Sequence, residues 1–78
     1  MSERIIPFAK SDKLVKARLP RSEIQMLAKL VEGLGHLGVV TTTDKVTGEV
    51  LFQATLDTWP DLRRAVEQMG LGVEFLEE

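Results

Sequence analysis

The chain has 78 residues, of which 44% are hydrophobic, and a formal net charge of −2, so it has room for one small domain. The sequence contains no cysteine, which excludes disulfides, thiolate catalysis and cysteine-ligated metals. It has no apolar run of transmembrane length, and its acidic balance argues against a dedicated nucleic-acid-binding protein. We therefore expect a soluble, cytoplasmic protein whose partners include neither a membrane nor nucleic acid.

The first twelve residues show neither helical nor strand periodicity, but they contain the apolar stretch Ile5-Ile6-Pro7-Phe8. Such a stretch is more apolar than a free terminus normally is. We interpret residues 1–12 as an N-terminal arm that lies against the surface of the domain. The alternatives are an added edge strand or an arm that reaches a second subunit, and Ile5, Ile6 and Phe8 would then be interface residues.

Two regular elements follow the arm. Alternating polarity over residues 13–19 predicts a strand, and apolar residues at helical spacing predict a helix over residues 21–33. We expect Ser22 to cap this helix, and Gly33 or Gly35 to end it in the left-handed conformation. The stripe expected to face the core is Ile24, Leu27, Ala28, Val31 and Leu34.

The second half of the chain begins with a predicted hairpin. Residues 36–43 are rich in β-branched side chains, residues 50–56 return as a strand, and a turn separates the two. A second helix is predicted over residues 58–69, with Thr58 as its N-cap and Trp59 as an anchor at the end of the core.

With a last strand at residues 72–76, the element order β-α-β-β-α-β is that of ferredoxin-like domains. Right-handed crossovers then give an α+β domain over residues 13–78, with a four-stranded antiparallel sheet in the order 4-1-3-2 and both helices on one face. Whether Thr41 or Thr42 joins the open face depends on a register that the sequence leaves open. The other residues expected on the open face are Leu14, Lys16, Arg18, Leu51, Gln53, Thr55 and Glu74.

Candidate chemistry is sparse. His36 is the only histidine and has no acidic partner near it in sequence, so we interpret it as a structural or exposed side chain. The positions where RNA-recognition domains stack bases carry no aromatic residue. We expect no catalytic residue, no metal site and no cofactor, and therefore no enzyme.

Residues 30–42, with the sequence Leu-Val-Glu-Gly-Leu-Gly-His-Leu-Gly-Val-Val-Thr-Thr, resemble a small uncharacterised prokaryotic family known only as a domain of unknown function. The resemblance covers residues 13–70, and it implies a soluble stand-alone domain without assigned functional residues. More distantly, the topology resembles ACT regulatory domains, which bind amino acids at subunit interfaces. Those domains carry a glycine between the first strand and the first helix, whereas Leu19–Ser22 contains none.

We expect a non-enzymatic interaction or regulatory module that works as a homo-oligomer. Pairing through the β-branched edge strand, at Val40, or through the N-terminal arm would add hydrogen bonds and apolar burial to a small core. The alternative is an ACT-like sensor that binds a small anionic metabolite near Pro20, Arg21 and Ser22, where a helix N-terminus favours anions.

Overall fold

Four strands and two α-helices form the part of the chain that this computed structural model describes, residues 13–76. The predicted arm, with Ile5, Ile6 and Phe8, lies outside the described residues. In chain order the elements are β1 (Lys13–Arg18), the 3₁₀ turn η1 (Arg21–Glu23), α2 (Ile24–Glu32), β2 (Gly38–Asp44), β3 (Glu49–Ala54), α3 (Trp59–Glu67) and β4 (Glu74–Phe75).

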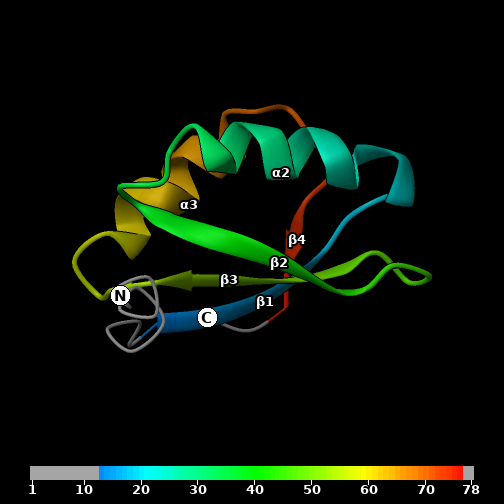
Figure 1. Cartoon of the computed structure of the whole chain (residues 1–78), viewed down its shortest axis with the longest axis horizontal. Coiled ribbons are helices and arrows are strands. Elements are labelled where there is room, and N and C mark those ends of the chain that lie inside the picture. The colour runs from blue at the N-terminus through cyan, green and yellow to red at the C-terminus, as the bar shows by residue number, and fades with distance from the viewer. Residues whose placement is uncertain (1–12, 77–78) are drawn as a thin grey trace, which may run out of the picture.

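The strands form one antiparallel sheet in the order β2-β3-β1-β4, and both helices cover the same face (Figure 1). This is the predicted order 4-1-3-2 read from the other edge, so the ferredoxin-like α+β fold is confirmed. The two central strands, β1 and β3, pair along their whole length, whereas β4 pairs with β1 through only two residue pairs, at Ala17 and Arg18.

The core lies between the sheet and the helices. Val15 and Ala17 of β1 and Val50, Phe52 and Ala54 of β3 are buried beneath Leu27, Val31, Leu62 and Val66 of the two helices. Trp59 is only 6% exposed, and its ring centroid lies 5.8 Å from that of Phe52 and 5.7 Å from that of Phe75. The prediction that Trp59 anchors one end of the core is confirmed.

The register decides which threonine lies on the open face. Thr41 is paired with Leu51 and Thr42 with the buried Val50, so Thr41 lies on the open face and Thr42 on the helix side. Arg18 is paired with Glu74 across β1 and β4, although no ion pair joins these two described side chains.

The start of α2 differs from the prediction. Residues 21–23 form a 3₁₀ turn, in which the Glu23 N–H donates to the carbonyl oxygen of Pro20, and the N-cap position of α2 is Glu23. Ser22 therefore lies inside the turn and does not cap the helix. The Glu23 carboxylate accepts a hydrogen bond of 2.8 Å from the N–H of Gly72, which ties the turn to the segment before β4.

The end of α2 also differs. Gly33 has φ −69° and stays right-handed, and Gly35 has no positive φ, so the expected left-handed ending is absent at both. The chain instead continues in tight turns, because Leu34 donates to Val31 and Leu37 donates to Leu34. These turns carry the chain from the helix to β2.

Thr58 occupies the N-cap position of α3 as predicted, but its hydroxyl does not cap the helix. Thr58 Oγ1 accepts from the N–H of Thr55 at 3.1 Å, and Thr55 Oγ1 accepts from the N–H of Thr58 at 3.0 Å. The two hydroxyls are also hydrogen-bonded to each other at 2.9 Å. This reciprocal pair fixes the short connection between β3 and α3.

Candidate functional site

Strand β2 forms one edge of the sheet that the structure describes. Six of its seven residues pair with β3 on one side, with a register shift at Thr43 between Thr42 and Asp44, and no described strand pairs with the other side. Such an edge presents unpaired N–H and C=O groups, which natural proteins often protect with lysine, proline or a very short strand. The sequence of β2, Gly-Val-Val-Thr-Thr-Thr-Asp, contains neither lysine nor proline. The opposite edge, β4, is only two residues long.

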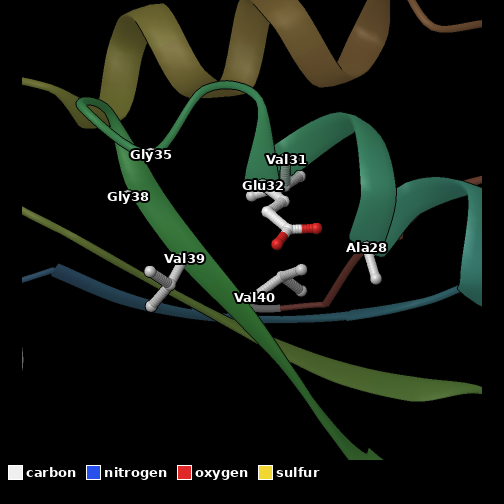
Figure 2. Close-up of a pocket in the computed structure, with 7 residues that line it drawn as sticks. All are labelled: Ala28, Val31, Glu32, Gly35, Gly38, Val39 and Val40. Carbon is white, nitrogen blue, oxygen red and sulfur yellow. The ribbon is translucent and has the colours of Figure 1, made fainter.

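A groove runs between β2 and α2, on the helix side of this edge. One part is a pocket of about 420 Å³ whose lining includes Ala28, Glu32 and Val40. The other part, of about 430 Å³, includes Arg21, Ala28 and Lys45. Because Ala28 lines both pockets, we treat them as one feature and call it the edge groove. Figure 2 shows its first part, with the Glu32 side chain extending from α2 toward Val40.

The prediction that Ala28 belongs to the core is wrong. The helical stripe placed Ala28 inward, but its side chain is exposed in the groove. The reason is that α2 lies over β2, the last strand of the sheet, so no further described element covers this flank of the helix. The apolar stripe of α2 is therefore wider than the core that the described residues provide.

The two ends of the edge groove carry opposite charge. Glu32 lies in the part lined by Gly38 and Val40, with its side chain extending toward Val40, and Arg21 and Lys45 lie in the other part. Within residues 13–76, none of these three side chains takes part in an ion pair or a side-chain hydrogen bond. Their charges are therefore not neutralised by a neighbour in the described part of the domain.

The predicted site residues separate in the structure. Arg21 and Val40 both line the edge groove, at different parts of it, and Val40 is half-buried. Ser22 is exposed and is not among the residues that line the groove. The sequence interpretation missed Glu32 and Lys45. Glu32 could have been found from its position four residues after Ala28, on the same flank of the helix.

The polar residues around the hairpin have structural partners. Asp44 Oδ1 accepts from the N–H groups of Val46 and Thr47, at 2.9 Å and 3.2 Å, which closes the turn after β2. Thr43 Oγ1 donates to the backbone carbonyl of Glu49 at 3.1 Å. His36 is exposed, and no group of three potential metal ligands occurs among the described residues.

None of the described helices is sufficiently long and apolar to cross a membrane. Residues 17–73 match a protein family that is described as a domain of unknown function (DUF4911). No curated protein and no solved structure matches the chain significantly.

Proposed function

Since the chain belongs to the DUF4911 family, a domain of unknown function, we propose from the structure that it is a non-enzymatic interaction module that works as a homo-oligomer. The pairing element in this proposal is the edge strand β2. Pairing would extend the sheet from one copy into the next and would place the apolar part of the edge groove in the interface.

The observation that carries the proposal is the combination of a seven-residue edge with an apolar flank. Four or more residues of β2 can form a ladder with another strand, whereas the two-residue β4 offers little to pair with. Next to this ladder, Val40 and the exposed Ala28 provide apolar surface that a second copy would remove from water. A domain of this size buries a smaller fraction of its surface than a large one, so added burial contributes substantially to its stability.

The non-enzymatic part of the proposal is supported by the polarity of the interior. Among the described residues, no charged or polar side chain is buried. Catalytic acids and bases are usually tuned by burial or by charged neighbours in a cleft. The charged residues that line the edge groove, Arg21, Glu32 and Lys45, are all exposed.

The test is to measure mass by sedimentation velocity over a wide concentration range, for the unmodified protein and for Val40→Lys. We expect a concentration-dependent oligomer that Val40→Lys weakens, because the change removes apolar surface from the interface and adds a charge that pairing would have to desolvate, even beside the Glu32 carboxylate. Val46→Lys is the matched control, since Val46 is 76% exposed in the turn beyond β2. A monomeric mass at every concentration for the unmodified protein would contradict the proposal, as would an equal effect of the two variants.

The N-terminal arm can be separated from β2 in the same assay. Deletion of residues 1–12 should leave an association through β2 intact. If the deletion abolished association and Val40→Lys did not, the arm would be the pairing element.

A second candidate function, the sensor for a small anionic metabolite, is favoured by one observation. Arg21 and Lys45 line the same part of the edge groove, next to the amide-bearing Gln25. Two cations and an amide could bind a carboxylate or phosphate. A thermal-shift screen with phosphate and simple dicarboxylates tests this candidate. We expect a rise in melting temperature that Arg21→Ala removes and Ser22→Ala does not, and no rise with any anion would exclude it.

A further inference from the structure

The charges at the ends of the edge groove follow from the direction of the chain. Helix α2 runs opposite to β2, so the end of the helix, at Glu32, lies beside the start of β2. Arg21, just before the helix, lies with Lys45 beside the end of the strand. Arg21 and Glu32 are eleven positions apart, which corresponds to about 16 Å along a helix at ~1.5 Å per residue. The acidic and basic side chains thus lie at different places along one edge.

From this arrangement we infer that the partner of β2 is the β2 strand of a second copy, bound antiparallel about a two-fold axis near Thr42. This register sets Val40, with the Glu32 side chain extended toward it, opposite the end of the second β2 strand. The inference rests on the proposed function, which leaves the direction of pairing open. A two-fold axis perpendicular to the strands exchanges the two ends of the groove. Glu32 of each copy then faces Arg21 and Lys45 of the other, and both contacts are attractive.

The other ways of pairing do not have this complementarity. A parallel pair would need a two-fold axis along the strands, which would put the α2 helices of the two copies on opposite faces of the joined sheet. Glu32 of one copy would then not reach Arg21 and Lys45 of the other, and the two grooves would not be joined. Pairing of β2 with the β4 edge of another copy would be head-to-tail, and such contacts form open chains unless they close into a ring. The two-residue β4 also offers a short ladder. The antiparallel pair is closed and self-complementary.

The same geometry accounts for the apolar flank. With the axis perpendicular to the sheet, the helices of both copies remain on one face, and each α2 lies over its own β2 strand, on its own side of the axis. Val40 and Ala28 of each copy would then line a shared apolar seam. This seam is bounded at each end by one acidic and two basic side chains, so polar groups surround an apolar centre, as in many protein interfaces.

The charge pattern allows a test by exchange. Glu32→Lys makes both ends of the groove basic, and the double variant Arg21→Glu/Lys45→Glu makes both ends acidic. Each variant alone should associate at least about tenfold more weakly, because both contacts of its dimer become repulsive. In an equimolar mixture, one copy of each variant restores two attractive contacts, so sedimentation velocity should show a dimer again.

Matched controls keep the change in charge and move it away from the groove. Glu74→Lys, on β4, is the control for Glu32→Lys. The double variant Lys16→Glu/Arg64→Glu is the control for Arg21→Glu/Lys45→Glu, with Lys16 on the open face of the sheet and Arg64 on α3. All three control positions are exposed. These controls should associate like the unmodified protein. Circular dichroism melting of every variant confirms that the domain is folded.

The outcomes distinguish this inference from the proposed function on which it rests. If the unmodified protein is a monomer, both the homo-oligomer and the antiparallel β2 pair are wrong. If the unmodified protein is an oligomer and the groove variants associate equally tightly, the β2 pairing or another contact stands and the antiparallel arrangement is wrong. The arrangement is also wrong if each variant is weakened but the mixture does not recover.

Discussion

Gly48, in the turn between β2 and β3, is the position where the structure predicts the sharpest effect of a single methyl group. Its φ is +80°, its N–H donates to the carbonyl of Asp44, and its carbonyl accepts from the N–H of Leu19, both at 2.9 Å. A Cβ atom at this position would lie 2.0 Å from the carbonyl oxygen of Leu19. Gly48→Ala therefore introduces both an unfavourable backbone conformation and a clash that forces the turn away from Leu19.

The magnitude can be estimated from these two contributions. The left-handed conformation costs a non-glycine residue about 1–2 kcal/mol, and loss of the Leu19–Gly48 hydrogen bond costs about 0.5–1.5 kcal/mol. Together they amount to about 1.5–3.5 kcal/mol, a large fraction of the ~4–12 kcal/mol expected for a chain of this size. Gly70 is the matched control. Its φ is +75°, but a Cβ atom there would meet no atom within 4 Å, so Gly70→Ala should cost only the first contribution.

Urea unfolding followed by the fluorescence of the single tryptophan, Trp59, measures both variants. Because association would add to the apparent stability, all proteins must be compared at one concentration. A further variant, Gly48→Asn, separates conformation from clash, since asparagine tolerates a positive φ but still carries a Cβ. We expect Gly48→Asn to recover much of the conformational contribution and to keep the loss caused by the clash, so its free energy of unfolding should lie between those of Gly48→Ala and the unmodified protein. Equal free energies of unfolding for Gly48→Ala and Gly70→Ala would refute the reasoning.

Two further predictions concern the second helix. Trp59→Ala should lower the free energy of unfolding by about 3–5 kcal/mol, because the ring packs on Phe52 at the end of the core. Urea unfolding followed by circular dichroism measures this loss, with Val46→Ala at the exposed turn as the control. A loss below about 1 kcal/mol would contradict the burial of the ring. Thr58→Ala should cost about 1 kcal/mol by leaving the N–H of Thr55 without its partner, whereas Thr58→Ser keeps the hydroxyl and should be close to the unmodified protein. If the serine variant were as unstable as the alanine variant, the hydroxyl pair would not be the stabilising feature.

The strand order and the faces of the sheet could be predicted from the sequence because they depend on rules that are local or topological. Alternation in β1 assigns Val15 and Ala17 to one face regardless of what surrounds the strand. The handedness of crossovers then leaves one arrangement for an element order β-α-β-β-α-β. Neither step needs a distance between residues that are far apart in sequence.

The helix ends could not be predicted in the same way, because several local interactions of similar strength compete there. Serine is a residue type that favours the N-cap position, but a 3₁₀ turn and the long-range hydrogen bond from Gly72 to Glu23 accompany an N-cap of α2 that lies one residue after Ser22, at Glu23. Thr58 stands at the predicted position, but its hydroxyl is bonded to Thr55 instead of the helix. Composition indicates which residue types favour a helix end, and the tertiary neighbours decide which interaction forms.

The edge groove shows a second reason why the sequence pattern did not predict the burial of every residue, and this one concerns the candidate functional site. A helical stripe indicates which flank of α2 is apolar, but it does not indicate where the sheet beneath the helix ends. Ala28 belongs to the stripe and is exposed because β2 is the last described strand of the sheet. In the antiparallel pair that we propose, Ala28 would lie over the joined β2 strands. The predicted core and the observed one thus differ at the flank of α2 that lines the edge groove, where opposite charges also lie. A second copy that covered this flank would bury Ala28, as the sequence pattern indicates.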